Sequence, residues 1–340
     1  MNEAYSLSSM WRRLPVVLIA APVLLWTAGC DSNDSGMDDE NGGNGGNGGD
    51  PVEVLSPYDT TGNVITVSEI EDEAGNPLGI GYEDASGNLV YDVTFTSDYE
   101  YVLDGYVYVN QNQTLTIEPG TVIRGKEEPT TGDQASALIV ARGGQIFADG
   151  EREDGTIDPI IFTAEADDVN DPTDLGPDDR QLWGGVIILG RAGNNVGGGT
   201  NYIEGLPTDD VRNQYGGTDD EDNSGVFRYV NIRHGGAIFG TDNEINGLTM
   251  GSVGSGTTIE YVEVFANEDD GFEWFGGTVN TRYLVAAFCG DDAFDYDEGF
   301  RGKGQFWFAI QAASGAGSGG EHDGGTNPET GTPYSMPVIY

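Results

Sequence analysis

The sequence predicts an all-β fold: a single-stranded parallel β-helix, a solenoid wound from short strands. Runs of four to eight β-branched or aromatic residues recur along the chain, separated by Gly, Asn and Asp. No stretch after the N-terminal thirty residues sustains an apolar period of 3.6, which excludes a mainly helical fold. One segment also matches the next at a fixed offset, as expected for coils stacked in register.

The N-terminal residues have the organisation of a lipoprotein signal peptide. The pair Arg12-Arg13 precedes an apolar run over residues 14–26, which is too short to span a bilayer comfortably. The following Thr27-Ala28-Gly29-Cys30 resembles the bacterial lipobox, whose Cys is lipidated. We expect residues 1–29 to be removed and Cys30 to anchor an exported protein in the cell envelope, with the outer membrane or cell surface favoured over the inner membrane and the leaflet left open. An ordinary signal peptide with a coincidental Cys is the alternative.

The rest of the chain divides into three parts by composition. Residues 30–55 are acidic and rich in Gly and Asn, so they cannot bury a core and are predicted to be a disordered tether. We expect an N-terminal β cap over 56–100 and the β-helix over 101–340. The chain ends on an apolar run, Met336 to Tyr340, without a polar capping segment. We therefore expect a β-helix truncated at its C-terminus, unless this run is a final strand that closes the last coil.

The charge balance excludes several kinds of partner. The chain carries 58 Asp and Glu against 14 Lys and Arg, a net charge of −44. Phosphate backbones require positive charge, so nucleic acid is not an expected partner, and no Gly-rich nucleotide-binding motif is present. Self-repulsion of this size is relieved by salt, which predicts a source organism that lives in brine. An ordinary acidic secreted protein loaded with calcium is the alternative.

The architecture is predicted best by comparing the chain with itself. Residues 261–278 match residues 283–300 at an offset of 22, and a third copy begins at Phe306. An interval of about 22 residues suits one coil of three strands and three turns, with coils about 4.8 Å apart. A sandwich needs no such alignment, and a propeller blade needs about 40 residues. The matched positions are Tyr261 with Tyr283, Asp269-Asp270 with Asp291-Asp292, Phe272 with Phe294, Glu273 with Asp295, Trp274 with Tyr296 and Gly277 with Gly299.

Three segments exceed a normal turn: 164–182, 191–224 and 311–335. All are rich in Gly, Asp, Asn and Pro. We expect these long loops to gather on one face of the solenoid, because such loops usually mark the working face.

Four segments carry a resemblance to a known family. Residues 101–125, 138–148, 159–164 and 183–190 resemble the right-handed parallel β-helix lipoproteins of marine and halophilic bacteria. The likeness covers most of residues 93–340 and implies a right-handed solenoid. The wider class includes pectate-lyase-like enzymes, phage tailspikes and adhesins, so the resemblance does not decide between catalysis and binding.

The stacked acids are the main candidates for chemistry. The offset of 22 places three pairs of acidic side chains on neighbouring coils, about 5 Å apart. Such charges repel by about 1 kcal/mol in water and by more when partly buried. They must therefore face solvent, retain a proton through a raised pKa, or share a cation, for which clustered carboxylates favour Ca²⁺. We take as candidate calcium ligands Asp269, Asp270, Asp291, Asp292, Glu273 and Asp295.

Other residues near this stack are candidates for binding or catalysis. Trp274 and Tyr296 are predicted to stack on sugar rings, or else to belong to the core. The run Glu321-His322-Asp323 is expected to fold back onto the same turns and contact the ligand. In an enzyme, Arg301 or Lys303 would abstract the proton α to a uronate, unless these cations only neutralise the acids. The catalytic candidates in that case are Asp270, Asp292, Arg301, Lys303 and His322.

These features favour a non-enzymatic, lipid-anchored envelope protein that binds a glycan or other surface polymer with Ca²⁺. One alternative is a calcium-dependent polysaccharide lyase or glycoside hydrolase that uses the stacked acids. Another is a structural spacer or adhesin. An open acidic groove would favour binding or catalysis, whereas a closed, side-chain-filled face would favour the structural role.

Overall fold

The computed structural model describes residues 59–340, except 73, 85, 87, 239–243 and 326–329. The predicted signal peptide (1–29), Cys30 and the tether (30–55) lie outside the described residues. Within the described part, the only helix is a 3-10 turn of three residues, η1 (Val211–Asn213). This part contains no helix with the length and hydropathy needed to cross a membrane. The all-β prediction is confirmed.

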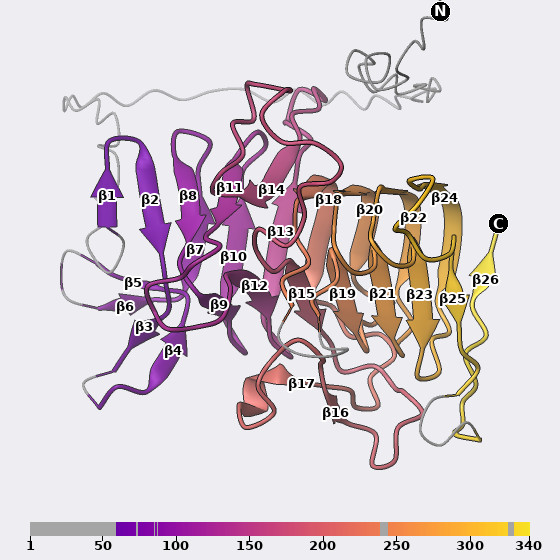
Figure 1. Cartoon of the computed structure of the whole chain (residues 1–340). Coiled ribbons are helices and arrows are strands. Elements are labelled where there is room, and N and C mark those ends of the chain that lie inside the picture. The colour runs from indigo at the N-terminus through magenta and orange to yellow at the C-terminus, as the bar shows by residue number, and fades with distance from the viewer. Residues whose placement is uncertain (1–58, 73, 85, 87, 239–243, 326–329) are drawn as a thin grey trace, which may run out of the picture. The chain divides into compact units, whose positions relative to one another are not determined.

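Most strands belong to two large sheets (Figure 1). The strands of the larger sheet are β1 (Asp59–Thr61), β2 (Val64–Val67), β7 (Asp92–Phe95), β8 (Glu100–Leu103), β10 (Thr114–Ile117), β11 (Val122–Gly125), β13 (Gln145–Asp149), β14 (Ile160–Ala164), β18 (Gly225–Arg233), β20 (Thr258–Phe265), β22 (Asn280–Ala287), β24 (Lys303–Ile310) and β26 (Val338–Ile339). The smaller sheet, which we call the seven-stranded sheet, contains β9 (Tyr106–Val109), β12 (Ala137–Val140), β15 (Val186–Leu189), β19 (Leu248–Gly251), β21 (Phe272–Phe275), β23 (Phe294–Asp297) and β25 (Glu321–His322).

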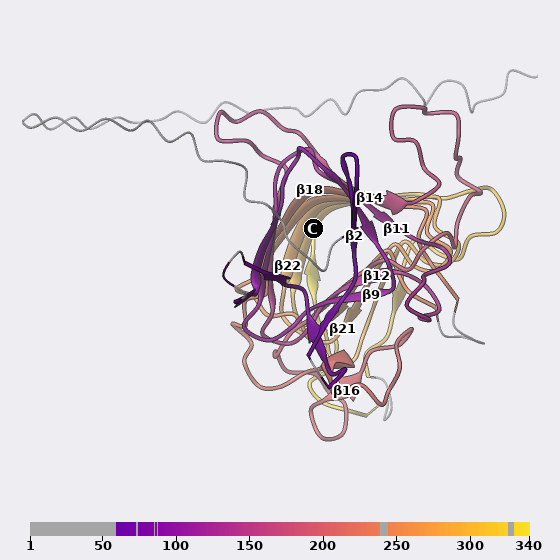
Figure 2. The ribbon, with the colours of Figure 1, turned by 90° about the vertical axis from the view of Figure 1, so that its left-hand side faces the viewer.

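The chain visits three parallel ladders in turn, which makes the fold a parallel β-helix. In the first coils the larger sheet holds two ladders, β2-β8-β11-β14 and β7-β10-β13, and the seven-stranded sheet is the third. The first two ladders merge in β18, which pairs with β13 through its first half and with β14 through its second. Seen from the N-terminal side, the strands of successive coils lie behind one another (Figure 2).

The predicted register between coils is confirmed. Phe272 pairs with Phe294, Glu273 with Asp295 and Trp274 with Tyr296, all in parallel strands. The third copy also falls where it is expected, because Leu284 pairs with Trp307 and Phe306 therefore lies beside Tyr283. The 22-residue repeat is thus one coil of the solenoid.

Long strands bend at a stacked column of aromatic residues. The strands β18, β20, β22 and β24 each contain one residue with φ between 54° and 60°, a conformation that is unusual for non-glycine residues. These residues are Tyr229, Tyr261, Tyr283 and Phe306, and their neighbouring ring centroids lie 4.6, 4.3 and 4.9 Å apart. The bend replaces the turn that separates two strands in earlier coils, and ring stacking offsets part of its backbone strain.

The core fills the interior of the coils, and a second apolar cluster covers the outside of the seven-stranded sheet. Alternate residues of this sheet point inward, among them Val107, Leu248 and Phe272. Outward residues of its early strands pack against the loop 191–224, which contains η1 and the short hairpin β16 (Asn201–Tyr202) and β17 (Gln214–Tyr215). This packing holds that loop on the outer face.

The long loops flank the seven-stranded sheet. Residues 165–182 enter β15, the loop 191–224 leaves it, and residues 311–320 lead into β25. The predicted loop 311–335 is therefore wrong as a single loop, because β25 pairs with β23 within it.

The parallel pairing begins before the predicted boundary at residue 101. β2 pairs with β8 and β7 pairs with β10, all in parallel. Three antiparallel hairpins lie in this region: β1 with β2, β3 (Ile70–Glu71) with β4 (Pro77–Gly79), and β5 (Tyr82–Glu83) with β6 (Leu89–Val90).

Candidate functional site

A cavity of about 570 Å³ lies beside the turns that precede β21 and β23; we call it the acidic pocket. Nine of its fourteen lining residues are acidic, and no Lys or Arg is among these fourteen. The acidic residues are Glu204, Glu244, Glu268, Asp269, Asp270, Glu273, Asp291, Asp295 and Glu321. Five of the six predicted calcium ligands therefore meet in one place.

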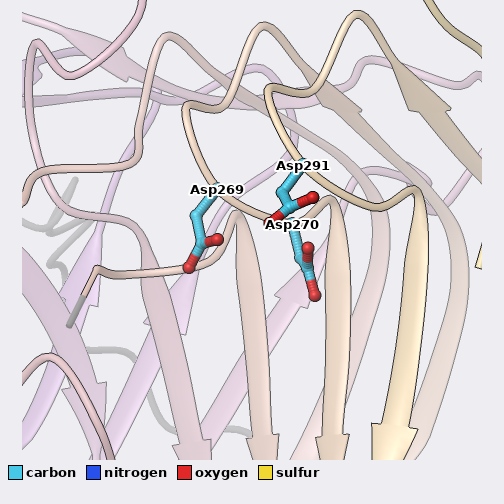
Figure 3. A group of neighbouring side chains, drawn as sticks. All are labelled: Asp269, Asp270 and Asp291. Atoms are coloured by element: carbon cyan, nitrogen blue, oxygen red, sulfur yellow. The ribbon is translucent and has the colours of Figure 1, made fainter. Parts of the chain in front are cut away.

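Two turns on neighbouring coils supply the first group of carboxylates. Asp269 and Asp270 precede β21, and Asp291 occupies the position of Asp269 on the next coil, by the register of the strands that follow. One carboxylate oxygen from each of these three residues lies within 4.8 Å of the others (Figure 3).

A row of outward side chains on the seven-stranded sheet supplies the second group. Thr249, Glu273, Asp295 and Glu321 are register partners on four successive strands. Because side chains alternate across a strand, the neighbours of these acids point into the core. Oxygens of Asp270, Glu273 and Asp295 lie within 4.8 Å of one another, so Asp270 belongs to both carboxylate groups.

Side-chain oxygens join the turn that contains Asp270 to the equivalent turns of the neighbouring coils. The Asn246 Oδ1 accepts a hydrogen bond from the Asp270 N–H at 3.2 Å, and the Asp270 Oδ1 accepts one from the Asp292 N–H at 2.8 Å. The Asp292 Oδ1 in turn accepts a hydrogen bond from the Ser318 N–H. This ladder of hydrogen bonds fixes the turns in register, so these oxygens have a structural role as well as a negative charge.

Glu204 lines the pocket, and the buried Asn246 supports two lining residues from behind; the sequence analysis missed both. The Asn246 Nδ2 donates hydrogen bonds to Glu273 Oε2 and to Glu204 Oε1, the latter at 3.2 Å. A signal for Asn246 was present, because residues 244–250 match residues 268–274 at an offset of 24. Glu204 had no such signal, since it is brought here by the packing of the loop 191–224.

Burial and mutual repulsion raise the pKa values of the clustered acids. Burial, together with the charges of Asp269 and Asp295, raises the pKa of Asp270 to about 9. Burial raises the pKa of Asp269 to about 7 with help from Glu204, and that of Asp295 to about 7 with help from Glu321. The same causes raise the pKa of Glu273 well above its ordinary value. Without a counter-cation, Asp270 therefore holds its proton at neutral pH, and the other three groups bind protons more tightly than a free carboxyl group does.

The carboxylates have the donor chemistry that a hard cation requires. Calcium takes several oxygen ligands in a flexible arrangement, and two groups of three carboxylates are available. In addition, the Oδ1 of Asp295 is buried without a hydrogen-bond donor among the described residues. A cation would supply the missing partner of this oxygen.

The predicted ligand contacts of Trp274 are wrong. Trp274 is fully buried, stacked on Trp307 with ring centroids 4.7 Å apart, because its position in the strand points inward. Tyr296 is the next residue of the same inward column, and its ring stacks on His322 at 4.2 Å. His322 and Asp323 do not line the pocket, whereas Glu321 does.

The cations predicted for lyase chemistry also lie elsewhere. Arg301 binds Asp220 at 3.1 Å and the Gly299 carbonyl oxygen at 2.9 Å. Lys303 is exposed at the start of β24. Both residues follow the strand β23, whereas the paired aspartates precede it. Asp292 is buried and faces Ser318, so it is the one predicted calcium ligand outside the pocket lining.

The comparisons with known proteins agree with the fold. A family model described as a pectate-lyase-like β-helix domain matches residues 87–340. No curated protein and no solved structure matches the chain.

Proposed function

The chain belongs to the pectate-lyase-like β-helix family, and from this premise we propose that it is a lipid-anchored envelope protein that binds Ca²⁺ in the acidic pocket and, with the ion, a glycan or other surface polymer. The observation that carries the proposal is the convergence of Asp269, Asp270 and Asp291 with Glu273 and Asp295 in one cavity. The anchor would be Cys30, at the end of the long N-terminal segment.

The electrostatics of the pocket favour a cation over an empty site. Several carboxyl groups here would remain protonated at neutral pH because ionising all of them together in a buried place is unfavourable. A divalent ion replaces these protons and neutralises the repulsion. Calcium binding should therefore release protons and should strengthen as the pH rises.

The ion would also explain how so acidic a protein binds an anionic polymer. A net charge of −44 repels a uronate or sulfated chain. If the protein carboxylates fill only some of the coordination positions of the calcium ion, oxygen atoms of the polymer can fill the others. Binding of the polymer would then depend on calcium.

The test measures calcium binding by isothermal titration calorimetry in buffers of different ionisation enthalpy. Wild type is compared with Asp269→Asn/Asp291→Asn and with Glu273→Gln/Asp295→Asn. Glu128→Gln is the matched control, because Glu128 is an exposed acid outside the pocket. We expect proton release in wild type and in the control, and affinity reduced at least tenfold in both double variants. Equal calcium affinity in all four proteins would refute the site.

A glycan array with and without EDTA tests the second half of the proposal. Polymer binding that is lost in EDTA and in the double variants supports a calcium-dependent binding module. If calcium binds but no glycan does, the ion has a structural role and the proposed glycan ligand is wrong.

One observation favours a glycoside hydrolase as the second candidate. Burial and neighbouring charges raise the pKa of Asp270 to about 9 and that of Asp295 to about 7, and two carboxyl groups whose pKa values are pushed apart are what acid-base hydrolysis needs. In that case Asp270 would donate the proton to the leaving oxygen. Release of reducing sugar by wild type and its loss in Asp270→Asn would support hydrolysis over binding alone.

A further inference from the structure

A second cavity of about 510 Å³ lies where the chain leaves the first strands of the seven-stranded sheet; we call it the arginine pocket. Its walls come from the turns after β9, β12 and β15 and from η1. The lining residues are Asn110, Gln111, Ala141, Arg142, Arg191, Val211 and Arg212. Three of the fourteen cationic residues of a strongly acidic chain therefore meet in one cavity.

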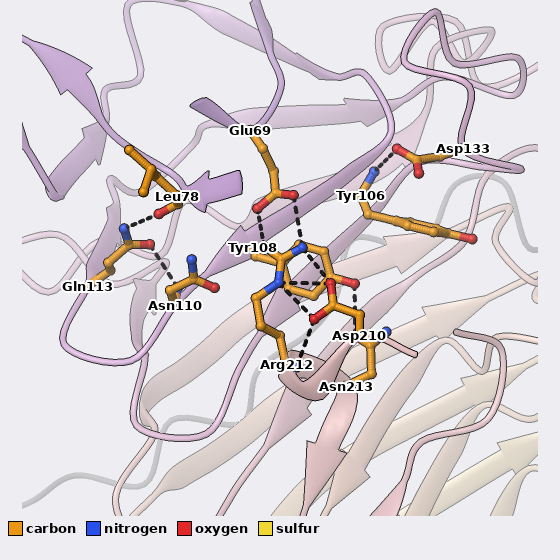
Figure 4. Close-up of polar contacts among 10 residues, drawn as sticks. All are labelled: Glu69, Leu78, Tyr106, Tyr108, Asn110, Gln113, Asp133, Asp210, Arg212 and Asn213. Atoms are coloured by element: carbon orange, nitrogen blue, oxygen red, sulfur yellow. Dashed lines mark hydrogen bonds and ion pairs between the residues drawn. The ribbon is translucent and has the colours of Figure 1, made fainter. Parts of the chain in front are cut away.

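The charge of Arg212 is neutralised by neighbouring carboxylates, and its side chain lines one side of the arginine pocket (Figure 4). Its guanidinium donates to both carboxylate oxygens of Glu69 and of Asp210. It also lies 3.8 Å above the ring of Tyr108. These contacts fix η1 against the outer face of the sheet and place Arg212 at the edge of the cavity.

Arg142 and Arg191, by contrast, have no carboxylate partner. Within the described residues, neither guanidinium lies within 4.0 Å of an acidic oxygen. Arg142 donates to the carbonyl oxygen of Gly216 at 3.1 Å and to the Gln214 side chain at 3.0 Å. Arg191 donates to the carbonyl oxygen of Arg142 at 3.4 Å. Each guanidinium has five N–H groups, so donors remain available on both.

The Arg191 guanidinium lies close against the backbone of Gly143, the residue that follows Arg142. Gly143 has φ +83°, and a Cβ there would lie 2.1 Å from the Arg191 Nη2. Burial lowers the pKa of Arg142, and the charge of Arg191 lowers it further, so the pair repels itself. The Oδ2 of Asp222 accepts a hydrogen bond from the Arg191 backbone N–H, and the Arg191 charge also lowers the pKa of Asp222 against the effect of its burial.

We propose that the arginine pocket binds the acidic group of a sugar-sized ligand, with Arg142 and Arg191 as the donors to its carboxylate or sulfate. Paired guanidinium groups match the geometry of a carboxylate or sulfate and hold it by charge-assisted hydrogen bonds. The cavity lies within the range of about 300–1,000 Å³ that is typical of small-molecule sites, so it exceeds what a bare ion requires. This site does not depend on calcium in the acidic pocket.

The test titrates the full-length protein with galacturonate, galactose and inorganic sulfate at constant ionic strength, with EDTA present. Galactose differs from galacturonate in lacking the carboxylate. We expect saturable binding of galacturonate, no binding of galactose, and an affinity for galacturonate lowered roughly tenfold or more in Arg191→Gln and Arg142→Gln. Arg282→Gln is the control for charge, because Arg282 is exposed and paired with Glu260.

The outcomes separate the possible ligands. If sulfate binds and galacturonate does not, the proposed sugar ligand is wrong and the pocket is a site for free anions. Galacturonate binding of equal strength in wild type and Arg191→Gln would overturn the pocket itself. Because Arg142 also holds the loop through Gly216, the melting temperature of each variant is measured first, and Arg191→Gln alone decides if Arg142→Gln fails to fold.

Discussion

The backbone N–H of Asp292 donates a hydrogen bond of 2.8 Å to the carboxylate of Asp270, which occupies the same position one coil earlier. The same relation joins Asp270 to Asn246. A side chain that was expected to serve only a ligand therefore also holds two coils together. Substitutions at Asp270 separate these two roles.

Replacing Asp270 by Ala should destabilise the protein, whereas replacing it by Asn should not. Alanine leaves the buried Asp292 N–H without an acceptor, which costs about 1–3 kcal/mol. Asparagine retains an Oδ1 acceptor and, like the protonated Asp270, adds no charge to the crowded cluster. Urea denaturation in EDTA measures both effects, and calcium binding should be weakened in both variants. Equal stability of Asp270→Ala and wild type would contradict the role of the ladder.

In EDTA, stability should fall as the pH rises. The folded pKa values of Asp269, Asp270 and Asp295, about 7, 9 and 7, lie above the unfolded value near 3.9. The folded state therefore binds more protons than the unfolded state between about pH 4 and 9, and their contribution to stability is lost across this range. Melting temperatures at pH 5, 7 and 9 measure the effect.

Two comparisons support this assignment. Asp269→Asn/Asp295→Asn should flatten the pH dependence, while Glu128→Gln should leave it like that of wild type. Saturating calcium should also reduce the loss at high pH, because the ion binds the deprotonated carboxylates. A melting temperature that rises from pH 5 to 9 in EDTA would contradict the buried, protonated cluster.

Tyr261→Ala should destabilise the solenoid by about 1–3 kcal/mol. Tyr261 stacks on Tyr229 and on Tyr283, and each aromatic pair contributes roughly 0.5–1.5 kcal/mol beyond burial. Tyr261→Phe should be close to wild type, since Phe306 occupies this position on a later coil. Tyr261→Gly should recover part of the loss, because glycine adopts positive φ without strain. Denaturant titration distinguishes these variants, and a glycine variant less stable than alanine would contradict the backbone argument.

Cys30→Ser should release the protein from membranes. If Cys30 carries a lipid, wild type expressed in a bacterial host will enter the detergent phase of a phase-separating detergent, and Cys30→Ser will enter the aqueous phase. Cys289→Ser is the matched control, because Cys289 is buried in the β-helix and forms no disulfide within the described part of the chain. Its partitioning should equal that of wild type. An aqueous wild type would exclude the lipid anchor.

The rings of the aromatic column pack mainly on one another. The rings at the bends lie face to face, so most of their faces are covered by one another and not by solvent. Trp274 is hidden for a different reason, the inward direction of its position in β21. In a repeating sequence, aromatic residues at equivalent positions are therefore better evidence of stacking between coils than of a ligand-binding site.

The repeat of the sequence by itself determined the β-helix, the register of its late coils and the stacking of Asp269 with Asp291 and of Glu273 with Asp295. This information is local, because a 22-residue period places each residue beside its counterpart whatever the loops do. Only the tertiary structure decided that Glu204 lines the acidic pocket and that Arg301 forms an ion pair with Asp220. It also decided that Arg142 and Arg191 line the same cavity. Those contacts depend on how the loop 191–224 packs across the sheet, and apolar burial, not periodicity, determines that packing.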